Sequence, residues 1–390
     1  MKFRDIAFRP EIQTALEEMG FEDLSPIQEK TLLPILEQRD IIAIAQTGSG
    51  KTSACGIPLI QLIDEENKAV QVLVMVPTRE LALQYEDELR DIGRYTKVQC
   101  ASVYGGTPMS MQRQQLKAGV HILVATPGRL IDVLHTGELE FGNLRTLVLD
   151  EADEMLKMGF LEDMQFIMSC IVGHHQKLLF SATMPKTLDH LIHQFLHDPI
   201  RIELNLVDVA PSSLTHEFIY VPRPGDREEK LFEFLDDRSR YRQVLIFCNS
   251  RFKGEHLFKK IRRVPEKSDY LHGGMEQDKR TRIFDKFKRG TLPILLATDV
   301  AGRGLDFSNV SHIINYDFPQ DSVTYTHRTG RAGRMGKKGV ARSFVTTRDI
   351  QTCYQIIETN NIEPVWLSPP PSRDRQQAGK RRTHHRRVRR

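Results

Sequence analysis

The sequence predicts an α/β protein of two tandem domains, each built on a parallel sheet. Its 390 residues exceed what one hydrophobic core ordinarily organises. Short runs rich in Val, Ile and Leu alternate with helix-patterned stretches, which is typical of parallel strands covered by helices. This series restarts after residue 240, so the pattern occurs twice along the chain.

The first series predicts the sheet of an N-terminal domain at residues 1–205. Each run is short and is rich in β-branched residues or leucine, as expected of buried strands. The runs are IIAIA (41–45), VQVLVMV (70–76), HILVAT (121–126), TLVLD (146–150) and KLLFSAT (177–183).

The second series predicts a C-terminal domain at residues 215–365. It opens with a strand-like run, THEFIYV, after the segment LNLVDVAPSS, and we assign residues 206–214 as the linker. The later runs are QVLIFC (243–248), PILLATD (293–299), HIINYD (312–317) and ARSFVT (341–346).

Small and charged residues follow nearly every run at once. They include QTGSGKT, PTREL, TPGR, EAD, SAT, NSR and VAGRGLD. Ligands of open parallel sheets bind outside the carboxyl ends of the strands, so each domain is expected to present a polar binding edge. Two such domains on a short linker would form a cleft that opens and closes.

Composition limits the class of protein. No apolar run approaches the ~18 residues of a membrane span, and MKFRDIAFRP lacks the apolar core of a signal peptide, so we expect a cytoplasmic protein with no membrane partner. The five cysteines match neither a zinc spacing nor a disulfide framework, which predicts free thiols.

The charge is divided unevenly along the chain. Residues 366–390 carry nine Arg or Lys against Asp374, so their net charge is +8; because the whole chain carries +4, residues 1–365 sum to −4. The segment is also poor in apolar residues and contains three consecutive prolines. We expect a disordered basic tail that binds polyanions, with a merely solubilising tail as the alternative.

A glycine-rich loop, AQTGSGKT, lies between a predicted strand and a helical pattern, which is the context of a phosphate-binding P-loop. Gly48 and Gly50 let backbone N–H groups face phosphate oxygens, Lys51 adds positive charge, and the Thr52 hydroxyl can ligate Mg²⁺. The expected phosphate-binding residues are Ala45, Gln46, Thr47, Gly48, Ser49, Gly50, Lys51 and Thr52.

The segment LVLDEADEM supplies the second half of this site. Asp150 ends an apolar strand, where its carboxylate can hold Mg²⁺ through water. Glu151 beside it is placed to orient or deprotonate an attacking water. A solvated acidic loop would contain the same residues, but the P-loop upstream favours the catalytic interpretation.

These motifs resemble those of the DEAD-box ATP-dependent RNA helicases of superfamily 2. DEAD stands at 150–153, with the P-loop before it and SAT at 181–183 after it, and about a dozen motifs follow the family's order from residue 3 to about 346. The resemblance implies two RecA-like domains with a nucleotide and RNA cleft between them. It also implies an RNA-stimulated ATPase with ATP as substrate and Mg²⁺ as cofactor.

The segment GFEDLSPIQ at 20–28 resembles the family's adenine-reading element. By that likeness Gln28 would hydrogen-bond the adenine edge, and Phe3 would stack on the ring. Without the resemblance, Phe3 would be interpreted as a core residue, and Phe21 is interpreted as packing.

Several short loops resemble the family's RNA-facing motifs. They are rich in N–H groups, Thr hydroxyls and Arg, which suit phosphates and sugars rather than bases. Contacts of this kind would favour RNA without reading its sequence. The expected RNA-binding residues are Thr78, Arg79, Gly106, Thr126, Gly128 and Arg129 in the first domain, and Gln277, Arg280 and Thr298 in the second.

The segment HRTGRAGR at 327–334 carries three arginines at every third position. The resemblance assigns Arg331 and Arg334 to the γ-phosphate as arginine fingers acting across the cleft. It further implies that Gly304 and Asp306 approach the ATP ribose. Interdomain coupling is assigned to Asp153, Ser181, Thr183, His327 and Arg328, with SAT bonded to the DEAD carboxylates.

These expectations describe an ATP-dependent RNA helicase that closes on ATP and RNA, destabilises short duplexes locally and is released by ATP hydrolysis. An ATP-gated RNA clamp or ribonucleoprotein scaffold that separates no strand is the main alternative, and a DNA translocase is a weaker one. A monomer is expected, with ribonucleoprotein or ribosome-assembly partners.

Overall fold

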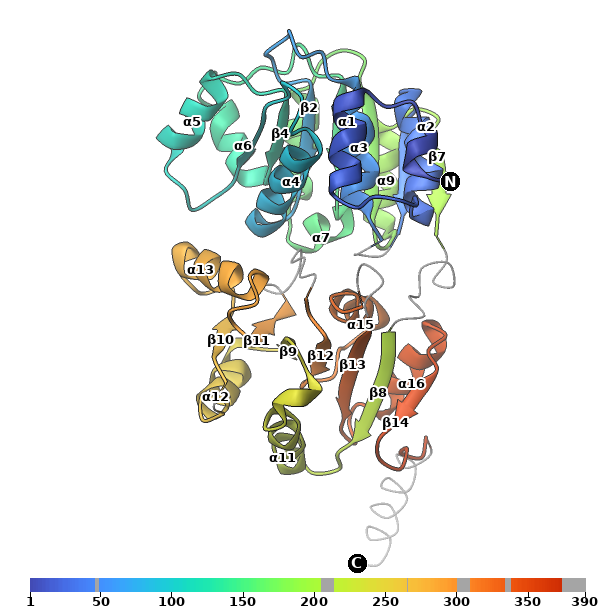
Figure 1. Cartoon of the computed structure of the whole chain (residues 1–390), viewed down its shortest axis with the longest axis vertical. Helices are drawn as coiled ribbons and strands as arrows, with labels where there is room; N and C mark the ends of the chain where they lie inside the picture. Colours follow the sequence, from blue (N-terminus) through green and yellow to red (C-terminus); the bar gives the residue numbers. More distant parts are fainter. Residues whose placement is uncertain (46–48, 205–213, 265, 300–308, 334–337, 374–390) are drawn as a thin grey trace, which may run out of the picture. The chain divides into compact units, whose positions relative to one another are not determined.

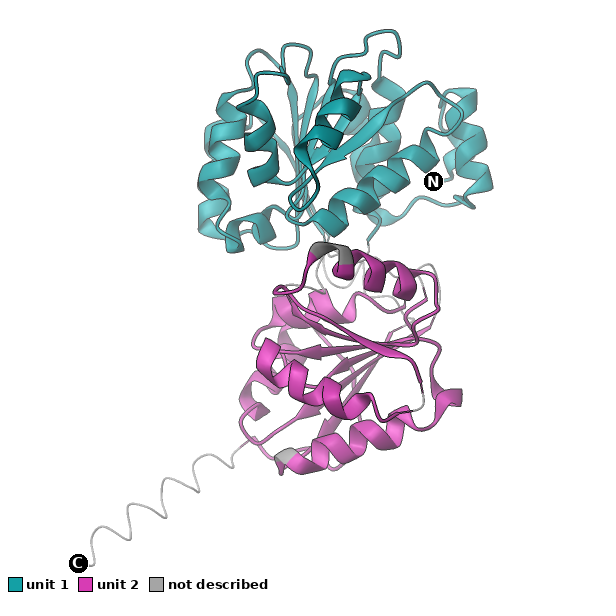
Figure 2. Cartoon of the chain, turned by 90° about the vertical axis from the view of Figure 1, so that its left-hand side faces the viewer, with its two compact units in different colours: residues 1–209 teal, residues 210–390 magenta. Residues whose placement is uncertain are grey.

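The computed structural model describes residues 1–45, 49–204, 214–264, 266–299, 309–333 and 338–373. The chain divides into two compact units, residues 1–209 and 210–390, and each is described by itself (Figure 2). Within the described residues, no helix is both long and apolar enough to span a bilayer.

Unit 1 contains a parallel sheet in the order β3-β4-β2-β5-β6-β1-β7 (Figure 1). Its inner strands are apolar on both faces, as expected when helices cover both sides of a sheet. The strands are β1 (Ile41–Ile44), β2 (Val72–Met75), β3 (Cys100–Val103), β4 (Ile122–Ala125), β5 (Thr146–Leu149), β6 (Gln176–Ser181) and β7 (Ile200–Glu203).

Helices cover both faces of this sheet. Ile41 and Ala43 of β1 pack with α1, α2, α3 and α4, whereas Ile42 packs with α6, α7, α8 and α9, because neighbouring strand residues face opposite sides. The elements are η1 (Phe3–Asp5), α1 (Pro10–Glu18), α2 (Pro26–Leu36), α3 (Lys51–Leu62), α4 (Arg79–Ile92), α5 (Met109–Lys117), α6 (Pro127–Leu134), α7 (Ala152–Lys157), α8 (Leu161–Ser169) and α9 (Lys186–Phe195).

Unit 2 contains a second parallel sheet in the order β10-β11-β9-β12-β13-β8-β14. This order reproduces that of unit 1 strand for strand, so β8, β9, β12 and β13 stand where β1, β2, β5 and β6 stand. The strands are β8 (Leu214–Tyr220), β9 (Val244–Cys248), β10 (Ser268–Leu271), β11 (Ile294–Thr298), β12 (His312–Asn315), β13 (Gly339–Val345) and β14 (Pro364–Trp366).

The helices of unit 2 also pack on both faces of their sheet. Ile246 of β9 packs with α11 and α12, and Leu245 packs with α13 on the other face, where α15 and α16 join through Phe218 and Val345. The elements are α11 (Pro224–Leu235), η2 (Arg238–Arg240), α12 (Arg251–Ile261), α13 (Gln277–Lys288), α15 (Ser322–Thr329) and α16 (Ile350–Thr359).

The start of the expected tail is corrected by the structure. Trp366 lies in β14, whose pairing with β8 brings it opposite Phe218, and the Leu367 N–H donates to the Phe218 carbonyl at 2.9 Å. Tyr354 donates its hydroxyl to the carbonyl of Pro371 at 2.6 Å, and Arg373 lies over the Tyr354 ring. Residues 366–373 are therefore part of unit 2, because their aromatic and proline contacts bind them to its edge.

Candidate nucleotide and RNA sites

The P-loop of unit 1 is bent where its sequence requires. Gly50 has φ +89°, and a Cβ there would lie 3.1 Å from the Ser25 hydroxyl, so glycine is needed for both conformation and space. Lys51 begins α3, is buried, and donates from Nζ to the Ala45 carbonyl at 3.0 Å. This hydrogen bond holds the Lys51 ammonium against the start of the loop, and Ser49 and Thr52 are close to Lys51 in the sequence. Gln46, Thr47 and Gly48 lie outside the described residues.

Gln28 packs directly against this loop. Its Oε1 accepts from the Ser25 N–H at 2.7 Å, which caps α2, and its Nε2 lies 3.2 Å from where a Gly50 Cβ would stand. Phe3 is buried, with its ring edge-on to half-buried Phe21 at 5.4 Å. In this conformation the Phe3 ring is covered, as the core interpretation expects, and stacking on adenine stays a prediction.

The acidic motif follows β5 at the same edge of the sheet. Asp150 is 2% exposed, and its two oxygens accept from the Tyr85 hydroxyl at 2.6 Å and the Glu151 N–H at 2.7 Å. Burial raises the pKa of Tyr85 well above its ordinary value, so the phenol stays a donor to the carboxylate. Glu151, the residue directly before α7, lies in the left-handed region at φ +50°, which is uncommon for a residue with a side chain.

A hydrogen-bond network joins the acidic motif to SAT. The Thr183 hydroxyl donates to Asp153 Oδ2 at 2.7 Å, and the Ala182 N–H donates to Oδ1 at 3.4 Å. Ser181 accepts from the Asp153 N–H at 3.3 Å and donates to the Thr183 carbonyl at 2.6 Å. The expected bonds between SAT and a DEAD carboxylate are present, and the carboxylate concerned is that of Asp153.

Two of the motifs expected to face RNA meet at Tyr104 of unit 1. The guanidinium of Arg79 lies over the Tyr104 ring at 4.5 Å, and its Nε and one terminal nitrogen are buried without a hydrogen-bond partner among the described residues. Thr78 caps α4 by accepting from the Leu81 N–H at 3.3 Å. Buried guanidinium nitrogens without acceptors are costly unless a ligand supplies one, so Arg79 is suited to an anion.

Arg129 braces the neighbouring loop. It donates to the Thr107 carbonyl and to Gln112 Oε1, both at 2.8 Å, which ties α6 to the glycine turn. Gly106 has φ +86°, and Gly128 is exposed at the start of α6, where an added Cβ would meet nothing. Thr126 is the residue before that helix. Part of Arg129 therefore serves the fold, while the helix start remains accessible.

Arg328, in the arginine segment of unit 2, has all of its side-chain N–H groups hydrogen-bonded. Its five N–H groups meet five acceptors, and the residue is 2% exposed. The acceptors are both oxygens of Asp299 at 2.5 and 2.7 Å, Asn249 Oδ1 at 2.7 Å, the Asp317 carbonyl at 2.8 Å and Asn315 Oδ1 at 3.3 Å. All five side-chain N–H groups of Arg328 are therefore engaged within unit 2, and its expected role at the interface between the domains stays a prediction.

The other residues expected in unit 2 are placed in part. Arg331 is buried and donates from Nε to the carbonyl of His327, which is itself buried, at 3.1 Å. Thr298 ends β11, and Gln277 and Arg280 stand in the first turn of α13. Gly304, Asp306 and Arg334 lie outside the described residues.

Comparison with known proteins identifies both units. Residues 25–191 match the family described as DEAD/DEAH box helicase, and residues 226–336 match the helicase conserved C-terminal domain. The DEAD-box ATP-dependent RNA helicase CshA of Geobacillus kaustophilus is 39% identical over 94% of this chain and 78% of its own length. The chain belongs to the DEAD-box ATP-dependent RNA helicase family.

Other relatives of this helicase agree. CshA of Limosilactobacillus reuteri is 38% identical over 96% of this chain and 75% of its own, and the chain spans 66% of the longer Bacillus cereus CshA. S. cerevisiae Dbp5 bound to RNA and ADP BeF3 is 26% identical, with a TM-score of 0.84 over 94% of this chain and 95% of its own. Mss116p bound to ssRNA and AMP-PNP is 30% identical, with a TM-score of 0.83 over 95% of this chain and 79% of its own. The tandem RecA-like fold and the ATP-dependent RNA helicase function are thereby confirmed.

The helicase's phosphate site fits a magnesium ion. Each Asp150 oxygen accepts only one of the bonds named above and keeps capacity for water, while Thr52 opens the first turn of α3. Oxygen donors of this kind suit Mg²⁺. The sequence interpretation missed Tyr85, because a tyrosine at helical spacing carries no signal that distinguishes it from the core.

Proposed function

We propose that the helicase closes its units on ATP and RNA, destabilises a short RNA duplex locally, and releases the strand once ATP is hydrolysed. In this cycle ATP and RNA each contact both units, so either ligand lowers the ordering cost for the other. The RNA-bound states of Dbp5 and Mss116p support RNA as the substrate. The basic residues beyond 373 add sequence-independent affinity for RNA.

Unit 1 supplies the phosphate site in this proposal. The Lys51 ammonium exchanges the Ala45 carbonyl for phosphate oxygens. Thr52 and Asp150 would hold Mg²⁺, which would supply positive charge to the phosphates. Glu151 orients the attacking water and takes its proton. The burial of Asp150 and its hydrogen bond from Tyr85 support this assignment. The Asp150 carboxylate is held by Tyr85 on one oxygen, and its other oxygen holds the Glu151 backbone in place.

Unit 2 supplies positive charge to the transferring phosphoryl group. The guanidiniums of Arg331 and Arg334 are proposed to act as arginine fingers, a contribution of ~10³-fold or more to the rate. The bond from Arg331 Nε to the His327 carbonyl supports this, because it fixes the arginine stem. Gly304 and Asp306 are proposed to approach the ribose, and Gln28 with Phe3 to select adenine.

RNA is proposed to bind through the loops at the carboxyl edges of both sheets. Thr78, Arg79, Gly106, Gly128 and Arg129 would hold the backbone on unit 1, with Thr126 at the same helix start, and Gln277, Arg280 and Thr298 would hold it on unit 2. The partnerless buried nitrogens of Arg79 support this, because a phosphate oxygen would supply the missing acceptor.

The observation that carries the proposed coupling is the bond from Thr183 to Asp153. Asp153 stands two residues after Glu151, in the first turn of α7. A displacement of SAT would therefore shift the backbone next to the proposed base. We therefore assign Asp153, Ser181 and Thr183 to the transmission of nucleotide state to RNA state.

A Thr183→Val variant tests this assignment, since it removes the hydroxyl and keeps the side-chain shape. RNA-stimulated ATP hydrolysis should stay within a few-fold of wild type, while ATP-driven release of a short duplex falls at least tenfold. Thr187→Val, at an exposed position of α9, is the matched control and should change neither rate. Equal duplex release by Thr183→Val and wild type would rule out the coupling role. A wild type that retains RNA with ATP but displaces no strand would establish the clamp alternative.

A further inference from the structure

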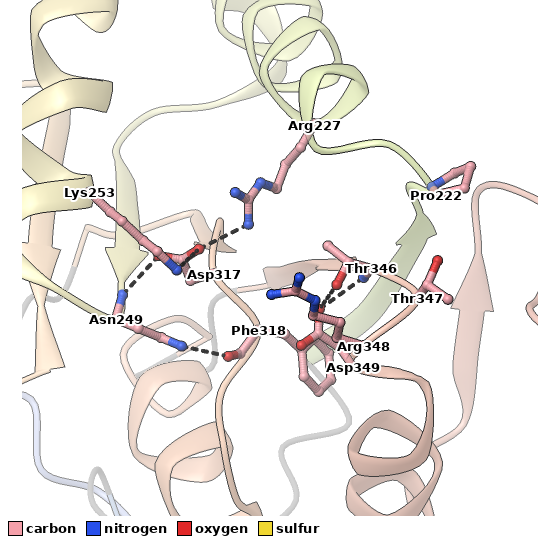
Figure 3. Close-up of a pocket in the computed structure, with 10 residues that line it drawn as sticks. All are labelled: Pro222, Arg227, Asn249, Lys253, Asp317, Phe318, Thr346, Thr347, Arg348 and Asp349. Carbon is pink, nitrogen blue, oxygen red and sulfur yellow. Dashed lines mark hydrogen bonds and ion pairs between the residues drawn. The ribbon is translucent and has the colours of Figure 1, made fainter. Parts of the chain in front are cut away.

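A pocket of about 470 Å³ lies at the carboxyl edge of the unit 2 sheet, and Figure 3 shows the residues that line it. Two of them, Asn249 and Asp317, also accept hydrogen bonds from Arg328. Its walls come from residues that follow β8, β9, β12 and β13, together with Arg227 from the first turn of α11. A volume of this size is within the range of small-ligand sites. None of the helicase's proposed catalytic or RNA-binding residues lines it.

The pocket occupies the place in unit 2 that the P-loop occupies in unit 1. In unit 1, β1, β5 and β6 lead into the glycine-rich loop, Asp150 and SAT. The strands at the same sheet positions in unit 2 are β8, β12 and β13, and they lead into Pro222, Asp317 and Thr346. The duplicated sheet therefore brings a second set of loops together at a position already used for phosphate.

The unit 2 pocket lacks the free carboxylate and the long phosphate-binding loop that a triphosphate and its metal ion require. Asp317 Oδ1 accepts from Arg227 at 2.9 Å, and its Oδ2 accepts from the Asn249 N–H at 3.0 Å, so an arginine holds the carboxylate that matches Asp150. The loop from β8 to α11 spans only residues 221–223, and α11 begins with Pro224, which has no N–H to offer. A single phosphate without a metal is the ligand that remains compatible.

Cations outnumber carboxylates around the pocket, with Arg227, Lys253 and Arg348 against Asp317 and Asp349. Arg348 is exposed and makes no hydrogen bond or ion pair within the described residues. The Lys253 Nζ lies 3.7 Å from Asp317 and its side chain is 59% exposed, which is a weak pairing. These two cations can turn to an added anion without breaking a buried bond.

An exposed aromatic residue directly precedes Lys253, a lining residue of the pocket, in the sequence. Phe252, between Arg251 and Lys253 in the first turn of α12, is 81% exposed. Exposed aromatic rings beside cations are typical of surfaces that stack bases of single-stranded nucleic acid. The pocket also continues the edge on which Thr298 lies, because β9 is the neighbour of β11.

We propose that this pocket binds a backbone phosphate of the RNA strand, with Phe252 stacked on an adjacent base. This proposal rests on the proposed RNA path over Thr298 and extends it across β9 and β12 toward β13. Arg348 and Lys253 hold the phosphate oxygens, and Arg227 keeps Asp317 from repelling them.

The test compares the affinity of full-length variants for a single-stranded oligouridylate, with a non-hydrolysable ATP analogue present, across a range of salt concentrations. The double variant Lys253→Gln and Arg348→Gln should bind roughly tenfold more weakly at low salt. Its dependence of log affinity on log salt should become shallower by about 0.7, the value for one phosphate of a single strand. Lys259→Gln, which removes one charge from the exposed side of the same helix, should change neither quantity by a comparable amount.

Phe252→Ala separates stacking from charge. It should weaken RNA binding several-fold and leave the salt dependence as in wild type, because it releases no counterion. If wild type binds the RNA but the double variant binds it equally well with the same salt dependence, the pocket does not hold an RNA phosphate. If AMP binds with an affinity that requires Arg348 while RNA binding does not, the phosphate comes from a free nucleotide and the proposal is overturned. If wild type itself binds no RNA, the proposed function fails first.

Discussion

Glu151 combines burial, a left-handed backbone and a position beside Asp150. Glu151→Gln keeps the size and hydrogen-bonding shape of the side chain while removing its basicity. ATP hydrolysis at saturating RNA should therefore fall by about 10²-fold or more, with ATP and RNA still bound. Steady-state ATPase assays and RNA retention with ATP measure the two effects. Hydrolysis at the wild-type rate would remove Glu151 from its proposed role.

The hydrogen-bond partners of Arg328 could not be predicted from its sequence motif. The sequence places three arginines in one segment, but only the folded chain shows that Arg328 meets five acceptors inside unit 2 while Arg331 is anchored through Nε. Three of its acceptors lie on the ends of other strands, away from Arg328 in the sequence, so no local sequence pattern predicts them. They are Asn249, Asp299 and Asn315.

Replacing Arg328 with lysine should destabilise unit 2 rather than only slow catalysis. A single ammonium cannot meet acceptors spread around a planar guanidinium, so buried oxygens lose their partners, at a cost of about 3–5 kcal/mol in the free energy of unfolding. Urea unfolding measures this loss. Arg240→Lys, at an exposed pair with Asp237, is the control and should cost under about 1 kcal/mol. Unchanged unfolding together with lost ATPase activity would favour an interface role for Arg328.

At the scale of elements, the sequence predicts the inner strands and misses the outer ones. Every strand absent from the prediction, β3, β7, β10 and β14, is an edge strand of its sheet. Inner strands are covered on both faces and form continuous apolar runs, whereas edge strands such as IRIE and SDYL are half polar. Such short, half-polar segments resemble loops until the neighbouring strand is known.

Two histidines on strands make unit 2 sensitive to acid. Burial lowers the pKa of both His216 on β8 and His312 on β12 from 6.5 to about 4. Burial also raises the pKa of Tyr325, whose hydroxyl is hydrogen-bonded to His216 Nδ1 at 2.7 Å. The folded state thus binds fewer protons than the unfolded state between these pH values.

Stability from these histidines is present above pH 6.5 and is lost as the pH falls toward 4. The thermal midpoint followed by circular dichroism should therefore drop more steeply between pH 6.5 and pH 4.5 in wild type than in His312→Asn. His256→Gln, at an exposed position, is the control and should keep the wild-type slope. Parallel slopes for wild type and His312→Asn would contradict the assignment.

At the scale of the whole molecule, the basic C-terminal residues are proposed to add electrostatic affinity for RNA. Deleting residues 374–390 removes a net charge of +7 and spares the packed segment that ends at Arg373. RNA affinity at low salt should fall and its salt dependence should become shallower, while ATPase activity at saturating RNA is retained. Unchanged affinity and slope would favour the solubilising alternative.

A larger truncation, which also removes the packed segment, serves as the comparison for that experiment. Deletion from residue 364 onward removes β14 and with it the Trp366 contacts to Phe218 and Tyr354. That larger truncation should lower the unfolding midpoint of unit 2, whereas the deletion of 374–390 should not. The two truncations thus separate a loss of RNA affinity from a loss of fold.

Trp366 is an intrinsic fluorescent probe of unit 2. It is the only tryptophan in 390 residues, and it lies half-buried against aromatic rings at the edge of one unit. Its intrinsic fluorescence therefore reports from unit 2 alone, without a label. The wavelength of that emission distinguishes a docked from a released C-terminal segment. Unfolding of unit 2 can therefore be followed by selective tryptophan excitation, since unit 1 contains tyrosines but no tryptophan.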